Sequence, residues 1–271
     1  MKQKRIALIN DITGFGRCSI TVELPIISAM KIQACPLPTA ILSVHTGFPN
    51  HFLDDYTNRM EMFIDSWKKN QLTFEGILTG FLSSKEQIEI VIEFIKDFRT
   101  DETKIFVDPV MGDDGRLYAS YTPEICDEMK KLVQYADLIM PNLTEACRLL
   151  DIDYPENVSE ADIWQMTEEI SNRGPSQVII TGVRFGTIMK NFVLDHGQKK
   201  IIEAEKIDGD RSGTGDAFAA IVSASMMNGE NLFESVKKAQ DFIGKSIDYA
   251  VKLDLPWNYG LPFEQFLTEL K

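Results

Sequence analysis

Near the end of the chain, a glycine-rich turn leads directly into an acidic residue. Gly213, Thr214 and Gly215 precede Asp216, and the small apolar residues that follow predict a helix. The first N–H groups of a helix have no partner within it, and the helix dipole adds positive potential, so such a turn binds anions. An acid placed inside an anion site can take a proton from a hydroxyl group. The alternative is an ordinary helix start, where an acid is also favoured.

Short apolar runs alternate with amphipathic segments over most of the chain. The runs predict strands that are buried on both faces, at residues 6–9, 76–79, 105–107, 138–140 and 178–180. The amphipathic segments predict helices at residues 86–98, 124–135 and 161–173. Residues 187–207 instead predict an antiparallel hairpin around a turn at 195–198. We therefore expect an α/β fold, a three-layer sandwich whose central, mostly parallel sheet carries an antiparallel hairpin at one edge.

Several notable residues, most of them polar, follow the ends of the predicted strands. In an open α/β sheet, ligands bind beyond the carboxyl ends of the strands, so these residues are expected to meet in one crevice. Carboxylates there suit Mg²⁺, which takes one or two acids together with phosphate oxygens and water. The residues concerned are Asn10, Asp11, Thr79, Gly80, Phe81, Asp108, Asn142 and Thr181.

Two of the acidic motifs have a simpler explanation. Asn142 followed by Glu145 can be a helix cap of the capping-box type, although a cap and a role at a metal are compatible. Asp113, followed by Asp114 and Gly115, can be a plain turn.

Composition and charge exclude several classes of protein. The 271 residues are 44% hydrophobic and 25% charged, which is typical of a globular protein, and we expect one domain over residues 1–271. The formal net charge of -13 disfavours nucleic acid and anionic membranes as partners. No apolar stretch approaches a signal peptide or a membrane span. Four cysteines without metal-ligand spacing fit a reducing, cytoplasmic location.

Two nucleotide-binding patterns are present only in part. Gly14 and Gly16 begin a dinucleotide fingerprint, but Ser19 stands at its third small position and no acid follows at the expected distance. Gly244-Lys245-Ser246 lacks the first glycine of a P-loop, since that position is Ala239. Neither pattern predicts a nucleotide site.

Four segments, taken in order, resemble a known superfamily. They are His45-Thr46-Gly47, Asp108-Pro109-Val110-Met111-Gly112-Asp113, Pro141-Asn142-Leu143-Thr144-Glu145 and Gly213-Thr214-Gly215-Asp216. Over nearly the whole chain this set resembles the ribokinase-like small-molecule kinases. Within them it is most similar to the vitamin B6 kinases, because of the Asp-Pro-Val-Met-Gly-Asp run and the segment 43–48. The same branch includes the hydroxymethylpyrimidine kinases.

The resemblance implies an activity and its requirements. It implies ATP-dependent phosphorylation of the 5′-hydroxymethyl group of pyridoxal, pyridoxamine or pyridoxine, a salvage route to pyridoxal 5′-phosphate. Asp216 would be the base, and the amides of Gly213, Thr214 and Gly215 would bind the transferred charge. ATP and Mg²⁺ are the implied co-substrate and cofactor, and a homodimer is the implied assembly. Dependence on a monovalent cation stays open.

The resemblance also implies binding residues. The metal would be held by Asp108 and Glu145. Around the pyridine ring, Asp11 could pair with the ring nitrogen or the 3-hydroxyl, His45 could donate to that oxygen, and Phe81 could line the flat face. Thr46 lies in the same loop as His45. The alternative interpretation is that these two residues only stabilise a turn. ATP would be bound by Asp113, Asn142, Glu145, Thr181 and Arg184, together with Gly213 and Gly215.

Two departures from the B6 kinase pattern leave other functions open. Asn10-Asp11 stands where those kinases usually carry a serine, and Phe81 replaces a frequent tyrosine. A hydroxymethylpyrimidine kinase of thiamine synthesis is therefore the first alternative. The second is a non-catalytic protein that binds the vitamer on the same fold, although such a protein would not need Asp216.

Overall fold

The computed structural model of the protein describes residues 3–207, 209 and 211–271. Within them, nine strands form one sheet in the order β11-β10-β9-β8-β5-β4-β1-β2-β3, and β6 and β7 form a separate hairpin. The strands are β1 (Arg5–Thr13), β2 (Gln33–Leu42), β3 (Leu53–Asp55), β4 (Gly76–Thr79), β5 (Lys104–Val107), β6 (Gly112–Asp113), β7 (Arg116–Leu117), β8 (Leu138–Ile139), β9 (Gln177–Phe185), β10 (Ile188–Asp195) and β11 (Gln198–Glu205).

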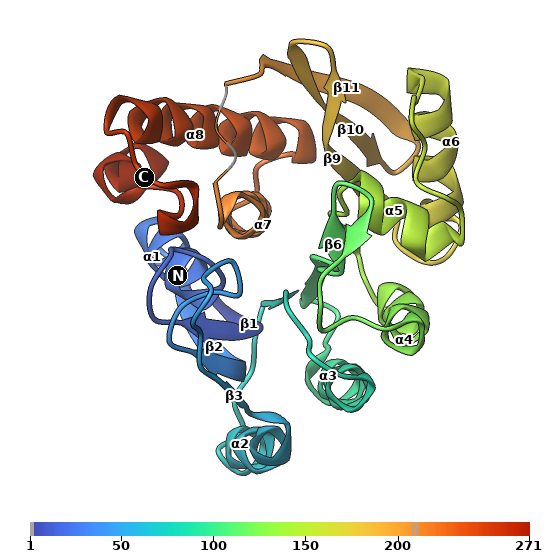
Figure 1. The fold of residues 1–271 in the computed structure, drawn as a ribbon. Coiled ribbons are helices and arrows are strands. Elements are labelled where there is room, and N and C mark those ends of the chain that lie inside the picture. The colour runs from blue at the N-terminus through green and yellow to red at the C-terminus, as the bar shows by residue number, and fades with distance from the viewer. Residues whose placement is uncertain (1–2, 208, 210) are drawn as a thin grey trace.

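Helices cover both faces of the sheet (Figure 1). One layer contains α1, α7 and α8, and the other contains α2 to α6. The helices are α1 (Ile20–Ala29), α2 (Thr57–Lys69), α3 (Lys85–Phe98), α4 (Pro123–Val133), α5 (Leu143–Leu150), α6 (Glu160–Ser171), α7 (Thr214–Met227) and α8 (Leu232–Lys252), with short 3-10 helices at Trp257–Tyr259 and Glu264–Leu270. This three-layer α/β architecture confirms the predicted fold class.

The alternation of side chains along β1 shows why the sheet is covered on both faces. Ile6 and Leu8 belong to the core under α1 and α7, while Ala7 and Ile9 belong to the core on the other face. Successive side chains of a strand point to opposite faces, so a strand buried on both must be apolar at every position. The continuous apolar runs in the sequence have this cause.

The sheet is mostly parallel, with antiparallel pairing at both edges. β2, β1, β4, β5, β8 and β9 pair in parallel in that spatial order. The predicted hairpin is β10–β11, with its turn at His196 and Gly197, and it continues antiparallel from β9. The antiparallel strand β3 on β2 was not predicted, because its three residues are all exposed and carry no apolar pattern.

Two strands run further than their apolar runs predict. β1 continues through Asn10 and Asp11 to Thr13, with an irregularity in register after Asn10. β9 continues to Phe185, so Thr181 and Arg184 lie within a strand and not in a loop after it. In β1 the polar side chains stay buried because hydrogen bonds satisfy them, and polarity therefore does not mark the end of the strand.

No helix among the described residues is long and apolar enough to cross a membrane.

Candidate active site

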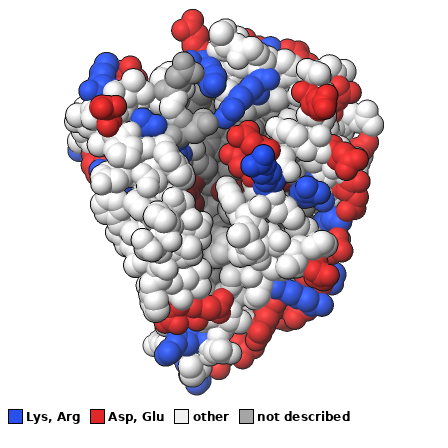
Figure 2. Space-filling model, viewed as in Figure 1, with Lys and Arg blue, Asp and Glu red and all other residues white. Residues whose placement is uncertain are grey.

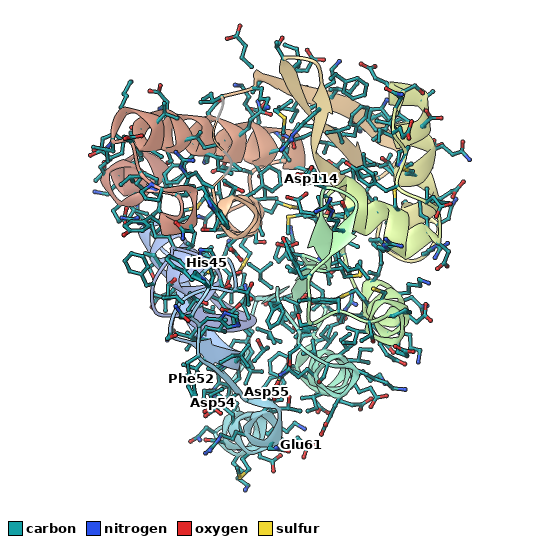
Figure 3. The ribbon with its side chains drawn as sticks, viewed as in Figure 1. His45, Phe52, Asp54, Asp55, Glu61 and Asp114 are labelled. Carbon is teal, nitrogen blue, oxygen red and sulfur yellow. The ribbon has the colours of Figure 1, made fainter. Side chains whose placement is uncertain are left out.

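The carboxyl ends of the parallel strands open into a hollow on one face of the molecule. Figure 2 shows this hollow running down the middle of the face, with acidic side chains at its border. His45, after β2, and Asp114, in the β6–β7 hairpin, lie on opposite sides of it (Figure 3). The loop that carries His45 and the hairpin that carries Asp113 and Asp114 therefore lie on the two walls of one hollow.

Asp216 lies in the first turn of α7, as predicted. The helix is capped by Gly213, whose φ of 81° is in the left-handed region that favours glycine. A Cβ at this position would clash with the carbonyl oxygen of Arg17. Ala217 makes the first main-chain bond of the helix to Gly213, so the N–H groups of Thr214 and Gly215 have no partner within the helix. This is the geometry of an anion site.

The carboxylate of Asp216 is held by groups from the N-terminal part of the chain. Its Oδ1 accepts a hydrogen bond from Nδ2 of Asn10 at 3.3 Å. Burial raises its pKa to about 6, while the backbone N–H of Ser19 and the Asn10 amide favour the charged form. A carboxyl group with such a pKa is ionised at pH 7 and is still basic enough to accept a proton from an alcohol in a transition state.

Asp108 lies directly beyond β5, close to this turn. A Cβ on Gly215 would lie 3.9 Å from Oδ2 of Asp108, which places the carboxylate beside the turn. Burial and the neighbouring Asp216 raise the pKa of Asp108 to about 8. Negative charge at this position is therefore under-compensated, and a bound cation would relieve the repulsion.

Asn142 and Glu145 form the capping box that begins α5. The Asn142 side chain accepts from the N–H of Glu145 at 2.9 Å, and Oε2 of Glu145 accepts from the N–H of Asn142 at 2.8 Å. Oε1 accepts from the N–H of Met111 at 3.1 Å. Burial and Asp108 raise the pKa of the Glu145 carboxyl. The structural interpretation of this motif is confirmed, and a role at a metal stays a prediction.

The other predicted nucleotide residues lie on the same wall. Asp113 ends β6, and Oδ1 of its side chain accepts from the N–H of Asp114 in a tight hairpin turn. Thr181 pairs with Asn142 in an isolated bridge, which brings β9 to the start of α5. Arg184 is exposed, with its guanidinium 3.9 Å from Asp114. Their roles in nucleotide binding stay predictions.

On the opposite wall, Asp11 is 5% exposed and its carboxylate is already engaged. Oδ1 accepts from the Ser19 hydroxyl at 2.5 Å and Oδ2 from the Thr13 hydroxyl at 2.6 Å. These bonds tie the end of β1 to the start of α1, across the loop 14–19. Ser19 has φ 55°, which is strained for a residue with a side chain. A contact between Asp11 and a ring would have to be made in addition to these bonds.

His45 joins the loop after β2 to the C-terminal segment. Its Nδ1 accepts from the N–H of Gly47 at 3.0 Å, so Nε2 carries the proton and donates to the carbonyl of Asn258 at 2.8 Å. The Ser212 hydroxyl lies 3.3 Å from Nε2 and donates to the carbonyl of Gly16 at 3.0 Å. Three segments far apart in the sequence therefore meet at this imidazole.

Aromatic rings gather around His45. Phe15 packs edge-on against Tyr259 and Phe48, with centroid distances of 4.9 and 5.8 Å. Thr46 is exposed in this loop. Phe81, after β4, is half-buried, and its ring packs edge-on against Tyr121. Flat apolar surfaces of this kind suit an aromatic ligand, although contact with a ring stays a prediction for His45, Thr46 and Phe81.

The carboxylates of the site fit a Mg²⁺ ion that is bound together with phosphate groups. Within residues 3–207, 209 and 211–271, no three His, Cys, Asp or Glu side chains could hold a metal ion by themselves. Mg²⁺ in kinases is held by one or two carboxylates, with phosphate oxygens and water completing the shell. Asp108, whose pKa is raised by its acidic neighbour, and Glu145 match that donor set.

Asn10, which was expected in the crevice without a role of its own, and Glu23, which was not predicted there, also belong to the site. Asn10 is 1% exposed and reaches Asp216, and Glu23 is 2% exposed and contacts Asn10. The signal that could have revealed Glu23 is a lone acid in the apolar segment 20–29. An ionisable group in such a segment is rarely buried without a purpose.

The layers, the edge hairpin and the acid at an anion-binding helix start together define the ribokinase-like class of small-molecule kinases. A solved structure with this fold is the pyridoxal kinase of Lactobacillus plantarum, which superposes with a TM-score of 0.92 at 23% identity, over 99% of this chain and 97% of that one.

Within this class, the chain belongs to the phosphomethylpyrimidine kinase family, whose model matches residues 20–258. It is similar to a protein of Bacteroides thetaiotaomicron, provisionally described as a phosphomethylpyrimidine kinase and crystallised with pyridoxal. That structure has a TM-score of 0.96 and 37% identity over 99% of this chain and 96% of that one. The pyridoxal kinase of Arabidopsis thaliana is 29% identical over 201 residues, 69% of this chain. The match spans only 62% of that plant protein.

Proposed function

We propose that this protein transfers the γ-phosphoryl group of ATP to the 5′-hydroxymethyl group of a vitamin B6 vitamer. Pyridoxal, pyridoxamine and pyridoxine are the candidate acceptors, and the products are the 5′-phosphate and ADP. The observation that carries the proposal is the position of Asp216: a carboxylate with a pKa of about 6 beside the N–H groups of Thr214 and Gly215, which have no partner within α7. Binding alone would not require a base in an anion site.

In the proposed reaction, Asp216 takes the proton of the 5′-hydroxyl while its oxygen attacks the γ-phosphorus and the bond to ADP breaks. The N–H groups of Thr214 and Gly215 would stabilise the charge on the transferred phosphoryl group. The Asn10 amide and the Ser19 N–H keep Asp216 oriented. Asp108 and Glu145 would hold Mg²⁺, which, when bound, would offset the negative charge of the phosphates.

The choice of a B6 vitamer rests on the aromatic residues that lie around His45. Phe15, Phe48 and Tyr259 present flat apolar surface beside His45, which suits a pyridine ring. The similar Bacteroides thetaiotaomicron protein was crystallised with pyridoxal, which supports the same acceptor class.

A hydroxymethylpyrimidine kinase is the second candidate function. It is favoured by the family description and by Asn10-Asp11, which stands where B6 kinases usually carry serine. Both candidates share the base, the anion site and ATP, so they differ only in the ring. The homodimer and the cytoplasmic location expected from the sequence stay predictions.

A coupled assay of ADP release tests the proposal. We expect turnover with at least one B6 vitamer in the presence of Mg²⁺, with kcat/KM at least about tenfold above that for hydroxymethylpyrimidine. A preference for hydroxymethylpyrimidine would select the second candidate. Vitamer binding by calorimetry without ADP release from any acceptor would select a non-catalytic binding protein instead.

A further inference from the structure

A buried glutamic acid lies behind the proposed base, and the reaction described above does not use it. Glu23 projects from α1, and its Oε1 accepts from Nδ2 of Asn10 at 2.9 Å. The same nitrogen donates to Oδ1 of Asp216 at 3.3 Å. One amide group therefore joins Glu23 to Asp216, and three elements, α1, β1 and α7, meet there.

The orientation of the Asn10 amide is set by the main chain. Its Oδ1 accepts from the N–H of Asp11 at 2.9 Å and from the N–H of Phe81 at 2.8 Å. The oxygen must face these two donors, so the two hydrogens of Nδ2 must face Glu23 and Asp216. Gly80 leaves room for this side chain, since a Cβ there would overlap the amide. All hydrogen-bonding capacity of Asn10 is thus used inside the protein.

The surroundings of Glu23 disfavour a negative charge. Its Oε2 is buried and has no hydrogen-bond partner among the described residues. Among the described residues, the charged groups with the largest effect on it are Asp216 from α7, Asp108 from the end of β5 and Asp11 from β1, which are all acidic. Burial and these acids raise the pKa of Glu23 well above its ordinary value. An ionised carboxylate with an unpaired oxygen would be costly here, so the neutral acid is favoured at pH 7.

We propose that Glu23 is a positioning residue: as a neutral carboxylic acid, it holds the Asn10 amide toward Asp216 and thereby orients the base without placing another negative charge beside it. This inference rests on the proposed role of Asp216. A neutral acceptor also explains how Asp216 can ionise in a site that contains several other acids.

The test compares Glu23→Ala and Glu23→Gln with Ile27→Ala, which removes a buried apolar side chain from the same helix. Glu23→Ala should lower kcat about tenfold with little change in KM for ATP, because the amide loses one anchor. Glu23→Gln should restore most of that loss, since its carbonyl accepts the same hydrogen bond. In both variants the midpoint of the acidic limb of the pH profile should stay within about half a pH unit of the wild-type value. Ile27→Ala should lose stability without the change in kcat.

Two results would overturn the inference. One is a folded Glu23→Ala enzyme with unchanged kcat. The other is a Glu23→Gln enzyme as slow as Glu23→Ala, with its acidic limb shifted to lower pH, which would mean that Glu23 is ionised.

A direct measurement separates this inference from the proposed function. In infrared difference spectra at pH 7, the carbonyl stretch of protonated carboxyl groups should be stronger in the wild type than in Glu23→Gln, because Asp108, whose pKa is raised to about 8, contributes to this band in both proteins. If no vitamer is phosphorylated, the proposed function fails, and this band still reports the state of Glu23. If turnover is normal and the band does not change, the inference fails alone.

Discussion

Asn142 and Glu145 cap the same helix reciprocally, each side chain accepting a hydrogen bond from the other residue's backbone N–H at 2.9 and 2.8 Å. Glu145 also accepts from the N–H of Met111, which follows β5. The carboxylate proposed to face Mg²⁺ thus also holds two loops of the site together. Its structural and functional roles need to be measured separately.

Glu145→Gln should affect both roles. Glutamine offers one acceptor oxygen where the carboxylate offers two, so one backbone N–H loses its partner, at a cost of about 1–3 kcal/mol in the free energy of unfolding. The Mg²⁺ concentration for half-maximal rate should rise about tenfold or more. Urea denaturation measures the first effect, and a Mg²⁺ titration of the rate measures the second.

The control is Asp162→Ala, in the capping box that Ser159 and Asp162 form at the start of α6. Alanine is used because both bonds from Ser159 go to Oδ2, and asparagine could keep them with its one oxygen. Asp162→Ala should lower stability and leave the Mg²⁺ dependence as it is. If Glu145→Gln behaves in the same way, Glu145 is only a cap.

Asp216→Asn should abolish most turnover. The amide cannot accept the proton of the hydroxyl, so kcat should fall by about 100-fold or more. The N–H groups at the start of α7 remain, and the affinity for ATP should change little. Steady-state rates together with nucleotide binding by calorimetry give both quantities, and a near-normal kcat would contradict the assignment of Asp216 as the base.

The raised pKa of Asp216 also predicts how rate and stability depend on pH. Since the base must be ionised, kcat/KM should fall as the pH drops below about 6. The pKa is higher in the folded protein than its ordinary value, so folding binds the proton more tightly. The stability due to this group is therefore full at low pH and is lost as the pH rises toward 6. Asp216→Asn should accordingly be more stable than the wild type above pH 6, with the difference shrinking toward pH 4, as urea denaturation at a series of pH values would show.

Thr46→Ala tests whether the loop after β2 binds the substrate ring. If the exposed Thr46 hydroxyl bonds the ring, its loss should raise KM for the vitamer about fivefold, the equivalent of roughly 1 kcal/mol for one hydrogen bond. KM for ATP should not change. Thr268→Ala, at an exposed threonine in the last 3-10 helix, is the control and should alter neither constant. Equal changes in both KM values for Thr46→Ala would argue for a general disturbance of the fold.

Gly16→Ala tests the junction around His45. Gly16 has φ 116°, and a Cβ there would overlap the His45 ring. The imidazole must then leave its bond to the Asn258 carbonyl, so KM for the vitamer should rise more than KM for ATP. Gly186→Ala also puts a side chain at a positive φ, but with a smaller strain, since φ 61° lies in the left-handed region that other residues can adopt, and the space around it is open. A loss of stability shared by both variants measures the strain, and a change in vitamer KM confined to Gly16→Ala measures the displaced His45.

Local patterns in the sequence determined the layers of the fold and the positions of its central strands. Continuous apolar runs in strands such as β1 and helical periodicity in α3 and α4 depend on neighbours only a few residues apart. The turn before Asp216 and the cap at Asn142 are local as well. Each of these features could be predicted because the interacting groups are close in the chain.

Only the tertiary structure decided which side chains support the predicted residues. The bond from Asn10 to Asp216 spans 206 residues, and the bond from His45 to Asn258 spans 213. The buried Glu23, the occupied carboxylate of Asp11 and the extension of β1 past its apolar run depend on such partners. Whether a polar group can be buried is settled by the donors and acceptors that packing brings to it from distant elements, and no local pattern encodes them.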